Sequence, residues 1–163
     1  MKTIYIVRHA KSSWEYEGID DIDRPLKKRG IKDAYLIAKV LKKKINKPDA
    51  FISSCASRAL HTGVIFCNTM GFPMANFKIS KSLYSFSDGY LVKTIKALDD
   101  DYDAAIIFSH DHGINTFVNT YGNKPITHVP TCGVIGIEFD TKHWKNIKSG
   151  KTVLKEFPKH YKQ

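Results

Sequence analysis

The sequence predicts one α/β domain in which a mainly parallel sheet lies between two layers of helices. Short apolar runs rich in Ile, Val and Phe alternate along the chain with segments of helical periodicity, as in α/β proteins. With 163 residues, 42% of them hydrophobic, the chain is long enough for one core and leaves little room for a second. These observations predict a three-layer α/β/α domain over residues 1–163.

Five apolar runs are predicted to form the strands of the sheet. They are short, rich in β-branched or aromatic residues, and bounded by turn-forming or charged residues. They span residues 3–7, 50–53, 104–108, 134–139 and 153–157. The first run ends at Arg8-His9 and the third at Ser109-His110, so charged or titratable residues follow two of the strands directly.

Helical spacing of apolar residues predicts four helices between these strands. The first covers residues 31–41, after a polar, acidic segment. The second is expected to be capped by Ser57 and to end before Gly71. Its inner face is expected to contain Leu60, Val64 and Cys67. The third follows Asp88, which we interpret as a helix N-cap, and a short fourth helix follows Gly113.

The composition restricts the class of protein and its partners. The formal net charge of +10 would attract anions of several kinds. Nucleic acid is not expected, because no aromatic-interleaved RNA motif or zinc-finger spacing accompanies the lysine clusters. Three widely spaced cysteines without a CxxC pair favour reduced thiols in the cytoplasm. No run approaches the roughly 20 apolar residues of a membrane span, so no membrane contact is expected.

Basic residues at strand ends predict one phosphate site. Arg8 and His9 follow the first strand, Arg58 lies in the first turn after the second, and His110 follows the third. The carboxyl ends of parallel strands meet at one edge of a sheet, where ligands bind. A guanidinium binds phosphoryl oxygens in pairs and stays charged. A neutral imidazole can attack phosphorus when its other nitrogen donates its proton to an acceptor.

The motifs around these residues resemble those of the histidine phosphatase superfamily, in the form found in its short SixA-like branch. Residues 6–14 resemble its Arg-His-Gly/Ala signature. The remaining similar segments are, in order, Asp23-Arg24-Pro25-Leu26 with Arg29-Gly30, Ser53-Ser54 through Ser57-Arg58-Ala59, Ser109-His110-Asp111-His112-Gly113, and Pro130-Thr131-Cys132-Gly133-Val134. Their order and spacing agree over nearly the whole chain.

This resemblance implies a phosphoglycerate mutase-like fold and a metal-independent phosphatase without a cofactor. It implies that His9 accepts the phosphoryl group, while Arg8, Arg58 and His110 form the cationic pocket around the transferring group. Ser13, in the first motif, is added to the expected substrate-binding residues. The branch includes enzymes that act on phosphohistidine, and the positive charge of the chain favours an acidic partner, so we expect the substrate to be an acidic phosphohistidine-bearing protein domain. We also expect a monomer.

Two departures from the family pattern leave roles open. The second-histidine motif carries an additional acid and base, so His112 is an alternative to His110 in the pocket. Residues 18–137 contain no glutamate, although mutase-like branches take their proton donor from that region. The donor to the leaving group is therefore Asp88, Asp111 or none, since a leaving group such as imidazole needs little acid assistance.

Three other functions compete with this interpretation. The same pocket would serve a generalist small-molecule phosphomonoesterase. His110, Asp111 and His112, with His9, would suit a metal-dependent hydrolase, although the charge of Arg8 opposes a cation. The third alternative is that the chain is a catalytically inactive relative of these enzymes, which only binds phosphorylated partners.

Two further motifs are interpreted as having no catalytic role. Gly150-Lys151-Thr152 resembles the end of a phosphate-binding loop, but Lys145 stands where its first glycine belongs. The pair Asp21-x-Asp23 is interpreted as loop charge, because no apolar strand precedes it.

Overall fold

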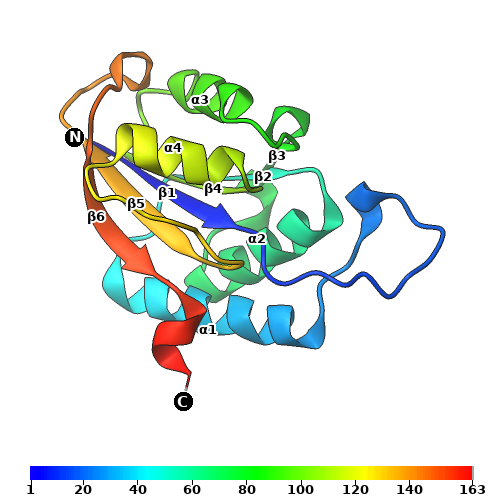
Figure 1. The fold of residues 1–163 in the computed structure, drawn as a ribbon. Coiled ribbons are helices and arrows are strands. Elements are labelled where there is room, and N and C mark those ends of the chain that lie inside the picture. Colours follow the sequence, from blue (N-terminus) through cyan, green and yellow to red (C-terminus); the bar gives the residue numbers. More distant parts are fainter. Residues whose placement is uncertain (163) are drawn as a thin grey trace.

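The computed structural model describes residues 1–162 and contains a six-stranded sheet with helices on both faces (Figure 1). The strands are β1 (Lys2–Arg8), β2 (Ala50–Ser54), β3 (Lys78–Ser80), β4 (Ala104–Ser109), β5 (Val134–Phe139) and β6 (Lys151–Glu156). Their order is β3-β2-β4-β1-β5-β6. The first four in that order are parallel, whereas β5 pairs antiparallel with both β1 and β6. The prediction of a mainly parallel sheet is confirmed for its centre.

Two pairs of helices form the outer layers. They are α1 (Lys28–Lys44), α2 (Ser57–Met70), α3 (Gly89–Lys96) and α4 (Gly113–Tyr121), and 3-10 helices occur at Asp21–Asp23, Met74–Asn76, Lys81–Leu83, Trp144–Asn146 and Pro158–Tyr161. Ile106 and Phe108 of β4 pack in the cluster that contains α1 and α2, while Ala105 and Ile107 pack with α3 and α4. This alternation buries both faces of the central strands and confirms the three-layer prediction.

The inner face of α2 agrees with the prediction at buried Cys67 and differs from it at the other two residues. The N-cap is Ala56 and the helix begins at Ser57, so Ser57 is its first residue and not its cap. The sheet-facing residues are buried Ala59, Thr62 and Phe66, whereas Leu60 and Val64 are only partly buried. Polar contacts set this rotation, because Thr62 Oγ1 accepts the Ala10 N–H at 3.0 Å and donates to the Arg58 carbonyl at 2.7 Å.

The short edge strand β3 was not predicted from the sequence. It has three residues, is partly or fully exposed along its length and pairs with β2 alone. A three-residue segment is too short for its alternation of apolar and polar residues to predict a strand. The last strand, β6, starts two residues earlier than predicted, so Lys151 and Thr152 of the rejected phosphate-loop motif lie in it.

Three smaller expectations concern thiols, membrane helices and a helix end. Cys55, Cys67 and Cys132 are free thiols, as expected. None of the helices in residues 1–162 is long and apolar enough to cross a membrane. Gly71 follows α2 with a φ of 74°, the left-handed conformation that the prediction of a helix end at this glycine requires.

The packing of strand ends brings the predicted residues together. Arg8 at the end of β1 is in register with Ser109 at the end of β4. The N–H of His9 donates to the Ser109 carbonyl at 3.2 Å, and the N–H of Cys132 lies 3.0 Å from both the Arg8 and His9 carbonyls. The backbone at His9 is therefore hydrogen-bonded to the end of β4, next to His110, on one side and to Cys132 on the other.

Gly30 is required by the close approach of α1 to the segment after His9. A Cβ at this position would lie 2.2 Å from the Lys11 carbonyl oxygen and 2.9 Å from the Lys11 nitrogen. We expect Gly30→Ala to lower the free energy of unfolding by about 1–3 kcal/mol, as overpacking does, measured by urea denaturation. Gly89→Ala is the control, because a Cβ there meets nothing within 4 Å in the described chain. Equal stability of both variants would contradict this account.

Candidate active site

The four basic residues predicted at strand ends line one hollow of about 340 Å³. The rings of His9 and His110 have their centroids 5.3 Å apart, and Arg8 and Arg58 line the same space. The other lining residues are Lys11, Ser12, Trp14, Asp21, Arg24, Phe86, Asp111 and Thr131. The structure thus brings together the set predicted from the sequence with Asp111, one of the candidate proton donors, and adds Arg24 and Asp21.

His9 is held in one tautomer by the backbone. Its Nδ1 lies 2.8 Å from the Ala10 carbonyl, which can only accept, so Nδ1 carries the proton and Nε2 the lone pair. Burial lowers the pKa of His9 to about 3; the Ala10 hydrogen bond opposes this shift, and Arg58 and Arg8 add to it. The ring is therefore neutral at physiological pH and has a free nitrogen for attack.

His110 is also neutral and is oriented by Ser54. Ser54 Oγ accepts the Ala56 N–H at 3.2 Å and lies 2.8 Å from His110 Nε2, which favours donation of the serine proton to that nitrogen. The ring proton then resides on Nδ1, a buried atom without a hydrogen-bond partner in residues 1–162. Burial, followed by the proximity of His9 and Arg58, lowers the pKa of His110 to about 3. His110 consequently offers a neutral N–H donor.

The arginines carry more buried N–H donors than the protein uses. Within residues 1–162, no hydrogen-bond partner is present for Nε of Arg8 and Arg58 or for Nη1 of Arg24, and Nε of Arg24 has only an ion pair with Asp21. Leaving such donors unpaired is costly in the protein interior, and charged donors cost the most. A phosphoryl group, with several anionic oxygens, is the ligand that this donor set fits.

The interpretation of Asp21 as loop charge was wrong. Arg58 donates to the Asp21 carbonyl at 2.7 Å and to its carboxylate at 3.0 Å, and the Tyr84 hydroxyl donates to the same carboxylate at 2.6 Å. Arg24 lies 3.2 Å from the other carboxylate oxygen. Burial raises the pKa of Asp21, but the hydrogen bonds from Tyr84 and Arg58 outweigh it and hold the pKa below the ordinary value. Asp21 is therefore an ionised group that positions two arginines.

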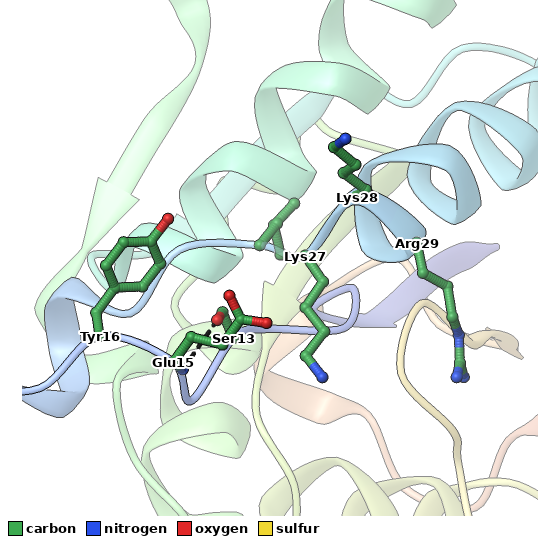
Figure 2. A pocket seen from close by; sticks show the side chains of 7 residues that line it. Ser13, Glu15, Tyr16, Lys27, Lys28 and Arg29 are labelled. Carbon is green, nitrogen blue, oxygen red and sulfur yellow. Dashed lines mark hydrogen bonds between the residues drawn. The ribbon is translucent and has the colours of Figure 1, made fainter.

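The expectation that Ser13 binds the substrate is not supported by its place in the structure. Its Oγ accepts the Glu15 N–H at 3.1 Å, and its own N–H donates to the Pro25 carbonyl at 2.8 Å. It lines a second hollow, shown in Figure 2, while the preceding Ser12 lines the active-site hollow. Side chains alternate along this extended segment, so a one-residue difference moves the serine to the opposite side.

The residues of the second-histidine motif, His110-Asp111-His112, do not all face the active-site hollow. His110 and Asp111 line the hollow, while the side chain of His112 is 88% exposed. Asp111 Oδ2 lies 3.6 Å from His112 Nδ1 and 3.9 Å from His128 Nδ1. Of the two histidines that could have lined the pocket, His110 does so and His112 does not. Because His112 points away, His110, Asp111 and His112 do not converge on one point as metal ligands would.

We expect the protein to lose stability as the pH falls from 7.5 to 5. His9 and His110 have a pKa of about 3 when folded and about 6.5 when unfolded. Between these values the unfolded state binds more protons, so the free energy of unfolding falls as the pH falls, by about 2 kcal/mol per histidine at pH 5. Urea denaturation at both pH values measures this. His110→Gln should show a weaker dependence, and a parent more stable at pH 5 would contradict the assignment.

Several solved structures with a similar fold are described as phosphatases. A protein histidine phosphatase SixA complexed with tungstate superposes with a TM-score of 0.84 at 18% identity, over 98% of this chain and 99% of that one. SixA from Nakamurella multipartitia gives a TM-score of 0.81 at 16% identity, over 96% of each chain. A mycobacterial glucosyl-3-phosphoglycerate phosphatase gives 0.71 at 12% identity, over 94% and 98%. The expected phosphoglycerate mutase-like fold is confirmed.

The fold and the family signature define the chain as a phosphatase. A family model described as histidine phosphatase superfamily (branch 1) matches residues 4–83, which contain Arg8, His9 and Arg58. The chain belongs to the histidine phosphatase superfamily. An uncharacterized protein of Mycobacterium tuberculosis is 26% identical over 164 residues, covering 93% of this chain and 98% of that protein. An uncharacterized chloroplastic protein of Arabidopsis thaliana is 32% identical over 104 residues, covering 62% and 48%.

Proposed function

We propose that this phosphatase transfers the phosphoryl group to His9 without a metal ion, and that its substrate is a phosphohistidine-bearing protein. The observation that carries the mechanism is the tautomer of His9, whose free Nε2 belongs to a hollow with unpartnered arginine donors. Arg8, Arg24 and Arg58 already supply positive charge, which disfavours an additional cation in the same space.

The reaction has two displacements at phosphorus. In the first, the lone pair of His9 Nε2 forms a P–N bond while the bond from phosphorus to the leaving group breaks, and the leaving group gains a proton. In the second, water forms a P–O bond, the P–N bond breaks, and the proton of water passes to a base. Arg8, Arg58 and His110 donate hydrogen bonds to the phosphoryl oxygens throughout, where charge develops.

We assign the proton transfer to Asp111. Of the two carboxyl groups on the hollow wall in residues 1–162, Asp21 is held ionised by Arg58 and Tyr84. Asp88 occupies the N-cap position of α3 outside the hollow, as predicted, although its side chain makes no capping hydrogen bond within residues 1–162. Asp111 Oδ1 is buried without a partner in the described chain. Asp111 is therefore the carboxyl group on the hollow wall that remains to exchange a proton with the leaving group.

Replacing Asp111 by Asn should affect substrates according to their leaving group. We expect kcat/KM for a phosphoserine peptide to fall about 10²-fold, because a poor leaving group needs general acid assistance. Turnover of a phosphohistidine peptide should change less than about threefold, since imidazole leaves without such help. Asp88→Asn is the matched control and should leave both substrates unaffected. A uniform loss on both peptides would remove Asp111 from this role.

Three features support phosphohistidine as the substrate. Imidazole is a good leaving group, which agrees with the lack of a glutamate in residues 18–137. The net charge of +10 favours an acidic partner. Two structural neighbours are SixA proteins, one of them described as a protein histidine phosphatase.

The decisive comparison is kcat/KM for a phosphohistidine domain, a phosphoserine peptide and small sugar phosphates, all with EDTA present. We expect the phosphohistidine domain to be the best substrate. A preference of more than about tenfold, or ~1.4 kcal/mol in the barrier, for a sugar phosphate would favour the generalist enzyme. Turnover that EDTA abolishes and added metal restores would favour the metal-dependent hydrolase. The absence of any turnover would favour a protein that only binds phosphorylated partners. The cytoplasmic location and monomeric state stay predictions.

A further inference from the structure

We propose that the second hollow receives carboxylates of an acidic protein substrate while the phosphorylated side chain of that substrate occupies the active site. This inference rests on the proposed function, because it identifies the surface that holds the phosphohistidine protein. The hollow has a volume of about 470 Å³, and its walls come from Ser13, Glu15, Tyr16 and residues 26–29 (Figure 2).

The second hollow adjoins the active site across a single extended segment, residues 12–16. Ser12 and Trp14 line the active-site hollow, whereas Ser13 and Glu15 line the second one. Ser12 is fixed by an isolated β-bridge with Leu26, so the two sides of the segment stay distinct. A protein that places a side chain in the active site therefore extends over a wall that the second hollow shares.

The charge of the second hollow suits carboxylates. Lys27, Lys28 and Arg29 line it together with one acid, Glu15, which leaves a net charge of +2. These cations lie at the N-terminus of α1, the positive end of the helix dipole, where acidic residues are the favourable choice. The first turn of α1 contains no acidic residue within the described chain. An anion bound there would relieve this repulsion.

Exposed aromatic side chains indicate a protein as the occupant. Trp14 is 74% exposed although the Arg24 guanidinium lies 3.4 Å from its ring centroid, and Tyr16 on the second hollow is 59% exposed. Phe86 is exposed on the wall of the active site. Aromatic side chains and arginine are enriched at protein–protein interfaces. A small phosphorylated molecule in the active site would not cover Tyr16.

The charges of the second hollow can be removed without leaving the buried carboxylate of Asp33 unpaired. The side chain of Arg29 is 66% exposed and 3.9 Å from Asp33, whereas Lys162 binds the same carboxylate at 2.8 Å. The test variant is therefore the triple substitution Lys27→Gln/Lys28→Gln/Arg29→Gln. The matched control is Lys39→Gln/Lys42→Gln/Lys43→Gln, which removes three exposed charges farther along α1.

The probes are two peptides that carry one phosphohistidine and differ only in having glutamates or glutamines beside it, together with an aryl phosphate. We expect the parent to prefer the glutamate peptide about tenfold in kcat/KM at low salt, and less as salt is added. The test variant should lose this preference, mainly through KM, and keep its aryl phosphate turnover within about twofold. The control variant should retain the preference.

Equal turnover of both peptides by the parent, or equal losses in the two triple variants, would overturn the docking site. Turnover of the aryl phosphate but of neither peptide would overturn it as well, while leaving the phosphatase activity intact. Failure to turn over any of the three substrates would contradict the proposed function itself, and with it the docking site.

Discussion

Replacing His9 by Ala should reduce phosphatase turnover by on the order of 10⁴-fold or more, the largest effect that this account predicts. The substitution removes an imidazole whose tautomer the backbone fixes, through the hydrogen bond from Nδ1 to the Ala10 carbonyl, and with it the lone pair on Nε2. His110 cannot replace it, since its Nε2 is already bound to Ser54. Steady-state kinetics with an aryl phosphate, in EDTA, measures the loss.

The control for this variant is His112→Ala. His112 lies two residues after His110, but its side chain is 88% exposed and points away from the hollow. We expect its turnover to stay within about twofold of the parent. If His9→Ala retains more than about a tenth of the parent activity, or if His112→Ala loses as much as His9→Ala does, His9 is not the nucleophile.

Replacing Arg58 by Ala should lower kcat/KM by on the order of 10²-fold, or ~2.7 kcal/mol, as loss of a donor to the transferring group does. Arg58 is held by two hydrogen bonds to Asp21, and its buried Nε has no partner within residues 1–162. Asp21→Asn should reduce the rate by a smaller factor, about tenfold, because it weakens the placement of Arg58 but leaves the guanidinium present.

Two controls separate this role from a structural one. Arg29→Gln removes an exposed arginine outside the active-site hollow and should leave aryl phosphate turnover unchanged. Inorganic phosphate should raise the melting temperature of the parent by binding the folded state, but not that of Arg58→Ala. A variant that is unfolded at ordinary temperature would show that Arg58 mainly stabilises the fold.

The sequence was sufficient to predict the central sheet and four of the residues in the hollow. Buried strands such as Ala104–Ser109 are continuous apolar runs, so their ends are visible in the sequence. The residues that follow parallel strands meet at one sheet edge, which is why Arg8, His9 and His110 were predicted to converge and do so.

The residues missed in the site depend on contacts between loops. Asp21 contacts Arg58, 37 residues later in the sequence, and Tyr84, 63 residues later. No local periodicity indicates either contact. One signal was present: Asp21 precedes Arg24 by three residues, next to a motif that resembles the family. The misplaced Ser13 has a different cause, because which side an extended residue faces depends on the pairing of Ser12 with Leu26.

The central claim is that the phosphoryl group passes through His9, and trapping the phosphoenzyme tests it most directly. Protein mixed with a labelled aryl phosphate in EDTA and quenched within the first turnovers should carry a phosphoryl group that is stable to alkali and labile to acid. Peptide mapping should place it on His9, and His9→Ala should carry none. An acid-stable label, a label on another residue, or a label retained in His9→Ala would contradict the claim.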